Sequence, residues 1–243
     1  MDAKTARALS DLTTDFYQHV SLSFSATRQA PWQGWDELVR VARGCELPVE
    51  GHLRVLDLAC GNLRFERYLH GLGYEVEAYA YDNCDELVGA GDAAGCAVAF
   101  HHADLVGALF EGGLGEVLDV PACDMAVCFG FMHHVPMGSL RRQVLGALVD
   151  AVRPGGVVAV SFWQFVRSAR LMAKAEPVEG GDEGDYLLGW QGRSDVRRYC
   201  HSFEEAEIDA LVRSCGSQVT EVARFSADGK TGDLNRYLIL RRN

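Results

Sequence analysis

The sequence predicts an α/β fold in which helices cover both faces of a mostly parallel sheet, with an antiparallel hairpin at the C-terminal end. Short apolar, β-branched runs alternate with longer amphipathic stretches, which is typical of strands joined by crossover helices. The C-terminal part has instead one helical segment, followed by two strand-type runs around a Gly/Asp/Lys turn. This second pattern indicates a closing hairpin.

The expected elements give a seven-stranded sheet of Rossmann-like type. Five strands are expected at residues 54–58, 76–81, 97–101, 125–129 and 157–162. Helical spacing is found at residues 63–71, 84–94 and 140–152. Pro154-Gly155-Gly156 is expected to break the chain tightly before the fifth strand. The C-terminal helix and the two hairpin strands are expected at residues 203–215, 218–225 and 234–240.

Two segments fall outside this pattern. We interpret residues 1–243 as a single domain, because a chain of this length can build one sizeable core. Residues 1–47 are expected to form two helices joined around residues 25–31, and residues 163–202 form an insertion rich in Gly, Asp and Arg. Open α/β sheets bind ligands at the carboxyl ends of their strands. We therefore expect the N-terminal helical cap and the insertion to cover the active site.

Composition indicates a cytoplasmic protein without a membrane anchor. No run approaches 18 consecutive apolar residues, and the N-terminus carries Asp2, Lys4 and Arg7 where a signal peptide would be apolar. The eight cysteines are scattered without a CxxC pair, so we expect reduced, buried thiols. His101-His102 near Cys96 lack a second pair at ligand spacing, and no metal site is predicted.

The charge is unevenly distributed along the chain. The net charge of −11 disfavours a nucleic-acid partner, since affinity for phosphates comes from Lys and Arg. Residues 46–124 contain 15 acidic residues against Arg54, Arg64 and Arg67, so this segment carries −12 and the rest of the chain +1. A polyanionic partner is thus disfavoured on one half of the molecule.

The strongest local motif follows the first expected strand. It runs from Val55 to Leu63, and its small-residue turn allows backbone N–H groups to approach a ligand closely. It resembles the first motif of class I methyltransferases that use S-adenosylmethionine (SAM), with Ala59 and Leu63 where glycines are usual. The resemblance implies that SAM is the cofactor. The matching positions are Asp57, Ala59, Cys60, Gly61 and Asn62.

Three further markers follow in the order of that family. Asp82, with Asn83 beside it, ends the second strand 25 residues after Asp57, where a carboxylate can accept both ribose hydroxyls. By resemblance, Asp104 and Leu105 meet the adenine, and Phe129 and Gly130 flank the methionine part. Taken singly, an acidic residue after a strand is more often a helix cap. Together the motifs cover roughly residues 50–165.

A narrower resemblance is found in the N-terminal segment, after the fourth expected strand and in the insertion. The segment from Phe16 to Trp32 is similar to the start of the tRNA wobble-uridine carboxymethyl methyltransferases, whose Phe-Ser-x-Thr-Arg leads into Pro-Trp. Further matches are Phe131-Met132-His133-His134, Asp185 to Trp190 and Arg198 to Phe203, where Cys200 replaces a usual tyrosine. That family methylates a carboxylate on a uridine of tRNA to a methyl ester.

The resemblance implies an acceptor site built around arginine. We expect Arg28 to hold the acceptor carboxylate, with Arg198 or His201 nearby, because a guanidinium offers a bidentate match. His133 and His134 would shape the pocket, and Trp163 or Trp190 would stack on a base. The alternatives are a salt bridge for Arg28, a turn bonded to backbone for the histidines and core packing for the tryptophans.

Other functions stay open at this stage. One is a methyltransferase for a small carboxylic acid or hydroxylated metabolite, which the acidic composition favours. If instead a tRNA is bound, we expect Arg28, Arg141, Arg142 and Arg198 to form one positive face at the pocket mouth. A third possibility is a non-catalytic methyltransferase-like scaffold, favoured by Ala59 and Leu63. Eukaryotic members of the tRNA family work with a small zinc-binding partner, and the sequence leaves open whether this chain needs one.

Overall fold

The computed structural model describes residues 1–45, 47–89, 91 and 93–243. It confirms the expected seven-stranded sheet, whose strand order is β3-β2-β1-β4-β5-β10-β9. The first five strands in that order are parallel, and β10 is antiparallel to β5 and β9, which makes the C-terminal hairpin. The strands are β1 (Gly51–Leu58), β2 (Tyr74–Asp82), β3 (Ala97–His102), β4 (Cys123–Cys128), β5 (Val152–Trp163), β9 (Val219–Ala227) and β10 (Asn235–Arg242).

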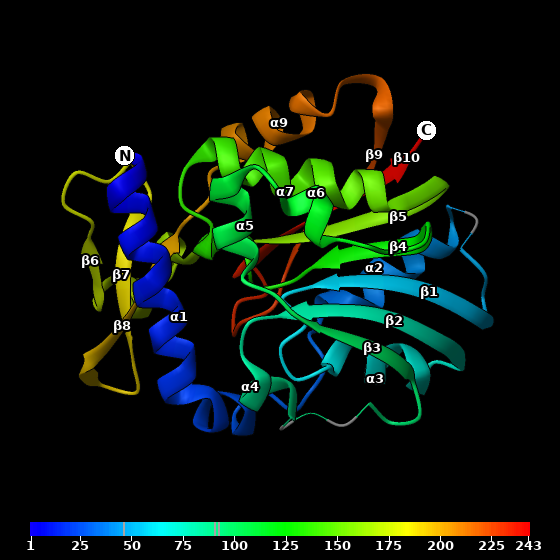
Figure 1. Cartoon of the computed structure of the whole chain (residues 1–243), viewed down its shortest axis with the longest axis horizontal. Helices are drawn as coiled ribbons and strands as arrows, with labels where there is room; N and C mark the ends of the chain where they lie inside the picture. The colour runs from blue at the N-terminus through cyan, green and yellow to red at the C-terminus, as the bar shows by residue number, and fades with distance from the viewer. Residues whose placement is uncertain (46, 90, 92) are drawn as a thin grey trace.

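Helices lie on both faces of this sheet, as expected (Figure 1). One face packs against α5 (Leu105–Glu111), α6 (Leu114–Val117), α7 (Gly138–Ala151) and α9 (Glu205–Ser214). The other face packs against α2 (Gly34–Arg43) and α3 (Arg64–Gly71). The remaining helical elements are α1 (Ala3–Ala26), α4 (Asp85–Gly89), α8 (Ala169–Met172) and the 3₁₀ turns η1 (Met132–His134), η2 (Phe165–Arg167) and η3 (Gly216–Gln218).

The central strands are buried on both faces, which is why they read as continuous apolar runs. Successive side chains of a strand point to opposite faces. In β1, Leu56 and Leu58 belong to the core under α7, whereas Leu53 and Val55 belong to the core under α2 and α3. A shift of one residue in register would exchange the two sets, so the apolar pattern fixes how β1 pairs with β2 and β4.

Three local expectations differ from the structure. The break expected at Pro154-Gly155-Gly156 is an irregularity inside β5, where the pairing with β4 jumps between Cys123 and Met125 and Gly155 has a φ of +78°. The helix expected at 84–94 is only α4, ending at Gly89, and residues 90 and 92 lie outside the described residues. The helices α5 and α6 were not predicted, because each spans only two turns or fewer.

The N-terminal segment and the insertion pack together. The two expected N-terminal helices are α1 and α2. The insertion contains an antiparallel sheet that was not predicted, formed by β6 (Ala175–Pro177), β7 (Asp185–Trp190) and β8 (Arg193–His201). This sheet lies beside α1 in Figure 1. The backbone N–H of Tyr199 donates to Thr13 Oγ1 at 3.1 Å, which joins β8 to α1.

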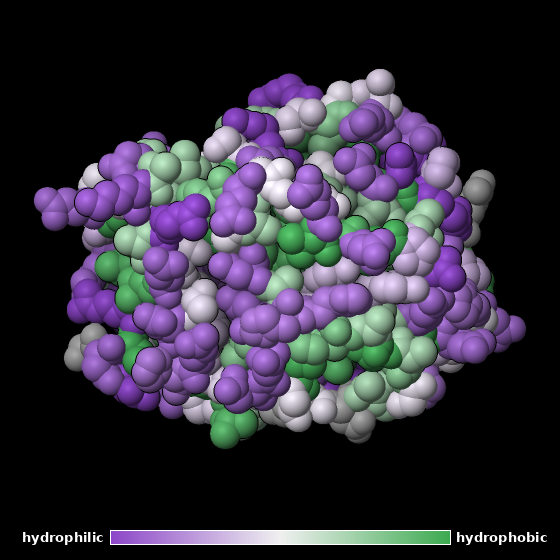
Figure 2. Space-filling model, in the orientation of Figure 1, coloured by the Kyte–Doolittle hydropathy of each residue, from purple (hydrophilic) through white to green (hydrophobic). Residues whose placement is uncertain are grey.

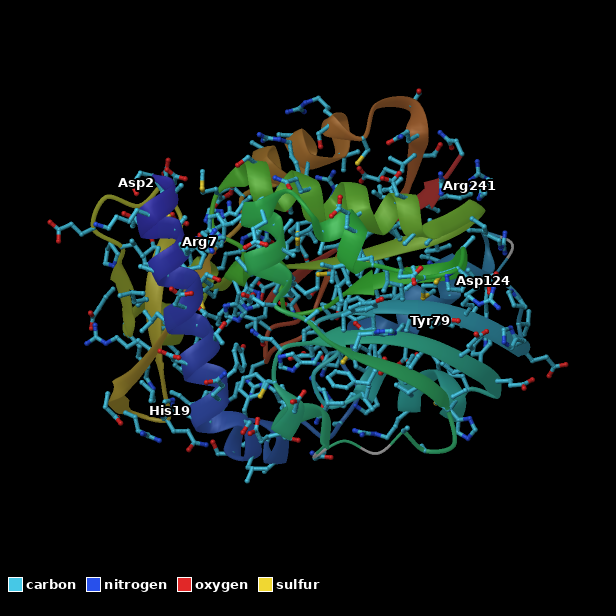
Figure 3. All side chains as sticks on the ribbon, in the orientation of Figure 1. Asp2, Arg7, His19, Tyr79, Asp124 and Arg241 are labelled. Atoms are coloured by element: carbon cyan, nitrogen blue, oxygen red, sulfur yellow. The ribbon has the colours of Figure 1, made fainter. Side chains whose placement is uncertain are left out.

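The outer surface is largely polar. Figure 2 shows hydrophilic side chains over most of one face, with an apolar area over β2 and the exposed edge strand β3. Asp2, Arg7 and His19 lie along α1 in Figure 3, and the guanidinium of Arg7 stacks on the ring of Phe110 in α5. None of the described helices is both long enough and apolar enough to span a membrane.

The turn after β1 is held in an unusual backbone conformation. Ala59, Gly61 and Leu63 have φ values of 60°, 56° and 57°, so alternate residues are left-handed. Glycine adopts this region freely, whereas a residue with a Cβ is strained there. The backbone N–H groups of Ala59 and Cys60 both donate to Tyr81 O, at 2.8 and 3.1 Å. The turn is therefore fixed to the end of β2 despite two non-glycine residues.

We expect Ala59→Gly to stabilise the protein. Relief of the left-handed strain outweighs the larger chain entropy of glycine, so the free energy of unfolding should rise by about 0.5–1 kcal/mol, measured by thermal and urea unfolding. Ala99→Gly in β3 is the control, because Ala99 is absent from the residues with positive φ, and this change should destabilise by about 0.5–1 kcal/mol. Similar losses in both variants would show that the Ala59 backbone is not strained.

Candidate active site

Asp82 connects the turn after β1 to the end of β2. Its side chain is 8% exposed, and its two oxygens accept the backbone N–H groups of Gly61 at 2.9 Å and Cys84 at 3.0 Å. Burial raises the pKa of this carboxyl, and the backbone hydrogen bonds oppose that rise. Each carboxylate oxygen has a second lone pair. Asp82 can therefore still accept hydrogen bonds from a ligand such as the two hydroxyls of a ribose.

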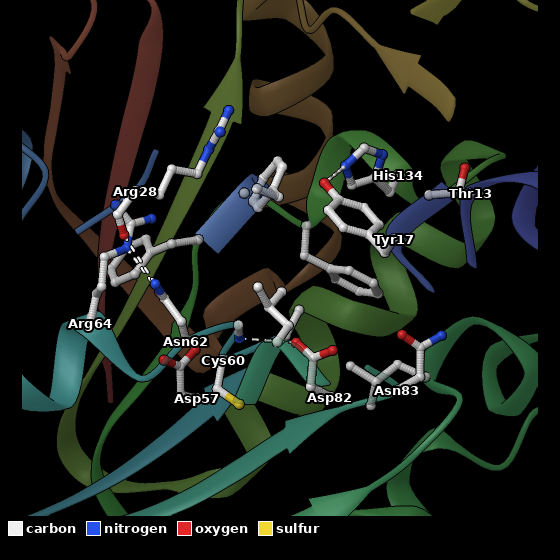
Figure 4. Close-up of a pocket in the computed structure, with 18 of the residues that line it drawn as sticks. Thr13, Tyr17, Arg28, Asp57, Cys60, Asn62, Arg64, Asp82, Asn83 and His134 are labelled. Carbon is white, nitrogen blue, oxygen red and sulfur yellow. Dashed lines mark hydrogen bonds between the residues drawn. The ribbon is translucent and has the colours of Figure 1, made fainter. Parts of the chain in front are cut away.

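A cavity opens at the carboxyl ends of β1, β2 and β4, where the strand order reverses around β1. All eleven residues expected to bind the cofactor line it, and Figure 4 shows Asp57, Cys60, Asn62, Asp82 and Asn83 around this space. These residues are Asp57, Ala59, Cys60, Gly61, Asn62, Asp82, Asn83, Asp104, Leu105, Phe129 and Gly130. The residues that the sequence predicted to lie together thus line this first cavity.

Asp104 is both a helix cap and part of the wall of the first cavity. It is the N-cap of α5, and its Oδ1 accepts the backbone N–H of Gly107 at 2.9 Å. It also lines the first cavity, as does Leu105. Capping occupies one of its oxygens, so the other is available to accept a hydrogen bond from an amino group.

A second cavity adjoins the first, and three of the five expected acceptor residues line it: Arg28, His133 and Arg198. The two cavities share five described residues, namely Tyr17, Phe24, Arg28, Trp32 and Gly130. We call these five residues the junction. The remaining walls of the second cavity come from Pro31 and Gln33, from Trp163, and from Asp228, Gly229, Leu234 and Asn235 of the β9–β10 hairpin.

The second cavity carries two guanidinium groups. Arg28 stacks on the rings of Phe24 and Trp190, with its Cζ 3.7 and 4.9 Å from their centroids, and burial lowers its pKa. Arg198 is 6% exposed, and its Nε has no hydrogen-bond partner among the described residues. Among the described residues, Arg28 has no partner for the salt bridge considered as its alternative; its Nη1 donates to Thr27 Oγ1 at 2.9 Å.

The two histidines of η1 are buried and point to different places. His134 lines the first cavity, where its Nε2 lies 2.9 Å from the hydroxyl of Tyr17, as drawn in Figure 4. Its Nδ1 lies 2.7 Å from the backbone oxygen of Tyr199, and burial lowers its pKa to about 3. His133 lines the second cavity, with its ring 4.8 Å from that of Trp163, and burial lowers its pKa as well.

His201 lies outside both cavities, unlike the expectation that it would approach the acceptor. Its Nδ1 bonds Asp185 Oδ1 at 2.7 Å and its Nε2 bonds Glu207 Oε1 at 2.9 Å. Arg141 joins the same buried cluster through Tyr199 and Glu207. The four arginines proposed as one positive face are therefore divided, because Arg141 is 3% exposed in this cluster while Arg28 and Arg198 line the second cavity.

The fold brings His133, His134 and Cys200 together, with potential ligand atoms within 4.8 Å of one another. The sequence did not indicate this group, since Cys200 is more than sixty residues away from the histidine pair. Both nitrogens of His134 already have hydrogen-bond partners, and the positive charge of Arg198 lies close enough to lower the pKa of each histidine. A cation would lose affinity beside that guanidinium, so we derive no step from a metal here.

The sequence did not indicate several of the residues that line the two cavities. Tyr17 and Trp32 lay in the N-terminal resemblance but were given no role, and Ser10, Thr13 and Thr14 were not singled out. Ser10 and Thr13 are buried small polar residues three positions apart on the inner face of α1. That spacing could have indicated a helix facing a polar cavity. Asp228 gave no signal, because its partners Gly34, Asn235 and Tyr237 meet only in the fold.

Beneath the turn lies a buried pair of carboxyl groups. Glu66 of α3 is fully buried, and neither of its oxygens has a hydrogen-bond partner among the described residues. Burial raises the pKa of Glu66 to about 7. Burial, and then the neighbouring charge of Glu66, raise the pKa of Asp57. The pair thus retains a proton into the neutral range, which limits the negative charge beneath the first cavity.

No protein-family model matches the sequence. It is 26% identical over 213 residues to a protein of Encephalitozoon cuniculi (strain GB-M1) that is named as a methyltransferase, covering 85% of this chain and 87% of the relative. It is 25% identical over 169 residues to the tRNA (carboxymethyluridine(34)-5-O)-methyltransferase of Macaca fascicularis. That match covers 67% of this chain but only 21% of the macaque protein.

Solved structures share the fold. The 1,6-didemethyltoxoflavin-N1-methyltransferase of Burkholderia thailandensis, solved with S-adenosylhomocysteine, superimposes with a TM-score of 0.64 at 19% identity, covering 100% of this chain and 92% of that one. A SAM-dependent methyltransferase of Clostridium acetobutylicum gives 0.61 at 12% identity, covering 94% and 98%. The protein therefore has the fold of class I SAM-dependent methyltransferases.

The protein should show a pH-dependent stability that depends on Glu66. The folded state holds this proton up to about pH 7, whereas an unfolded glutamate releases it near pH 4.3. The folded state binds more protons between these values, so its stability falls as pH rises through this window. Glu66→Gln should reduce that fall, leaving the part that the buried Asp57 carboxyl contributes, and should raise the free energy of unfolding at pH 8 by about 1–3 kcal/mol, measured by urea unfolding from pH 4.5 to 8.

The exposed Glu75 of β2 provides the matched control, and Glu75→Gln should leave the pH dependence of wild type unchanged. A Glu66→Gln variant with the same slope as wild type would show that Glu66 is ionised throughout this range.

Two variants should separate cofactor binding from acceptor binding. Asp82→Ala removes a buried hydrogen-bond acceptor and should weaken SAM binding at least about tenfold, measured by calorimetry. Arg28→Ala should leave the dissociation constant of SAM within about threefold of wild type and lower methyl transfer, because its guanidinium is assigned to the acceptor. Equal losses of SAM affinity in the two variants would contradict this division.

Proposed function

We propose that this protein is a class I methyltransferase with SAM as its cofactor, and that it transfers the methyl group of SAM to a carboxylate on the wobble uridine of a tRNA, which gives a methyl ester. The observation that carries the proposal is the charge of the second cavity. Arg28 and Arg198 line it, and its one described carboxylate, Asp228, is already engaged by Gly34 N–H, Asn235 and Tyr237. An anionic acceptor fits a cavity whose uncompensated charges are both positive.

The roles of the residues follow from this chemistry. Bound SAM supplies a methyl group activated by the positive sulfonium, so the protein contributes mainly alignment. Asp82 and the turn around Gly61 would orient the cofactor, and Arg28 with Arg198 would hold the carboxylate. A carboxylate is ionised at neutral pH and needs no general base. The low pKa values of the buried His133 and His134 agree with a site that removes no proton.

The N-terminal helices and the insertion would recognise the rest of the acceptor. We propose that the helices of residues 1–47 and the insertion of residues 163–202 form one cover over the second cavity, since a hydrogen bond joins Thr13 of α1 to Tyr199 of β8. Trp163 lines this cavity and is available to stack on a uracil ring. Trp190 is engaged differently, because its ring packs on Phe24 and Arg28. Its role would be to support Arg28.

The tRNA part of the proposal is supported by the macaque relative and by the resemblance of the N-terminal segment and the insertion. A second candidate, a small carboxylic acid, is favoured by the arrangement of charges. Arg193 of the insertion pairs with Asp195 at 2.6 Å, Arg197 pairs with Glu176, and Arg141 is buried. These arginines are therefore compensated and offer little to a phosphate backbone. Both candidate acceptors present a carboxylate to the second cavity, and they differ in whether a tRNA or a small molecule carries it.

Methyl transfer from labelled SAM tests both candidates. The protein is incubated with bulk tRNA or with an extract of small metabolites, with Asp82→Ala as the blank. We expect label in tRNA that mild alkali releases, as a methyl ester requires. Arg198→Gln removes a cavity charge and should reduce this incorporation at least about tenfold, whereas Arg193→Gln on the exposed strand end should not.

The other outcomes distinguish the candidates. Label found only in small molecules would replace the tRNA proposal by the second candidate. Alkali-stable label would contradict a carboxylate acceptor in either case.

A further inference from the structure

The junction of the two cavities is where methyl transfer must take place. The transferred group leaves one bound molecule and reaches the other, so it has to lie where the cofactor cavity meets the acceptor cavity. Among the described residues, Tyr17, Phe24, Arg28, Trp32 and Gly130 line both spaces. Tyr17 contributes the only side-chain oxygen of these five. Figure 4 shows this hydroxyl above the cofactor cavity, on the opposite side from Arg28.

The direction of the hydrogen bond between Tyr17 and His134 is determined by the backbone. The nearest partner of His134 Nδ1 is a carbonyl oxygen, Tyr199 O at 2.7 Å, which can only accept. His134 Nδ1 therefore carries the proton. Because burial lowers the pKa of His134 to about 3, the ring is neutral and its Nε2 has a bare lone pair. Tyr17 must then donate its hydroxyl proton to Nε2, at 2.9 Å.

Because of this bond, the hydroxyl oxygen of Tyr17 can only accept hydrogen bonds from a bound ligand. A phenol has one proton, and here it is committed to His134. The ring is also fixed in place, because Phe16 and Phe24 pack edge-on against it with centroids 5.1 Å away. Burial raises the pKa of Tyr17 to about 12, so the hydroxyl stays protonated at neutral pH. The junction thus presents a fixed hydrogen-bond acceptor with no donor.

We propose that Tyr17 distinguishes SAM from the product S-adenosylhomocysteine by directing this lone pair at the sulfonium. The methyl and methylene groups on a positive sulfur are polarised donors of weak C–H···O contacts, and the thioether of the product lacks both the charge and the methyl. Arg28 across the junction would repel the same charge and suits the acceptor instead. His134 is the positioning residue that fixes the polarity of Tyr17.

The inference rests on the proposed division between the two cavities but not on the identity of the acceptor. Binding of SAM and of S-adenosylhomocysteine can be measured on the full chain without any acceptor. A failure of the tRNA proposal would therefore leave these measurements intact, and a failure here would leave the acceptor assay intact.

Calorimetry gives the ratio of the two dissociation constants in wild type and in Tyr17→Phe. We expect Tyr17→Phe to weaken SAM about two- to fivefold more than S-adenosylhomocysteine, the factor that one weak C–H···O contact is worth. Tyr79→Phe is the matched control. Tyr79 lies on β2 outside both cavities, with its hydroxyl bonded to Glu77 at 2.8 Å, and its loss should leave the ratio unchanged.

A second pair of variants tests the role of His134 and does not require Tyr17→Phe to fold. His134→Gln keeps an acceptor for the Tyr17 proton and should retain the preference for SAM. His134→Leu frees that proton and should lose the preference. The ratio should also stay constant from pH 6 to 9, because neither His134 nor Tyr17 titrates there.

Equal weakening of both ligands by Tyr17→Phe would overturn the proposal, since it would assign Tyr17 to the methionine or nucleoside part that both ligands share. A ratio unaffected by His134→Leu would overturn the role of His134. A methyl-transfer rate that loses a basic limb of its pH profile in Tyr17→Phe would also overturn it, because Tyr17 would then be a proton acceptor for the reaction.

Discussion

The active site depends on how the end of β1 is joined to the end of β2. Parallel pairing brings Leu58 beside Tyr81, and the turn that follows is then held by Tyr81 O and by the carboxylate of Asp82. These bonds fix a backbone that two non-glycine residues, Ala59 and Leu63, would otherwise avoid. The tertiary structure thus maintains a turn that glycine-rich sequences adopt with less strain.

A second set of contacts joins the N-terminal segment of residues 1–47 to the turn after β1 and to neighbouring elements. Asn62, at the centre of the turn, donates to Ser25 Oγ and to the backbone oxygen of Arg28. Tyr17 reaches from α1 to His134 after β4, and Thr13 reaches to β8. The loop that carries Arg28 is therefore fixed relative to the turn that faces the cofactor. Such alignment of two bound molecules is the main contribution that a protein can make to methyl transfer.

The fold and the residues that line the first cavity were predictable because their signals are local. Strand β1, its turn and Asp82 each follow from adjacent residues, and the strand order brings them together without further information. The lining of the second cavity was only partly predictable. Arg28 and Arg198 reached the second cavity as expected, but His201 did not, because two carboxylates from β7 and α9 occupy its nitrogens. No neighbouring residue in the sequence reveals those partners.

The sequence by itself determined the alternation of strands and helices, the register set by strands that are apolar on both faces, and the chemical types of the residues that line the first cavity. Only the tertiary structure decided which charges are compensated and which remain available. Arg141 and Arg198 are the same type of residue, yet Arg141 lies in a buried ion cluster, whereas the Nε of Arg198 has no hydrogen-bond partner among the described residues and lies beside a cavity. Polar groups are satisfied by whatever the fold places within about 3 Å of them, and that distance is not related to separation along the chain.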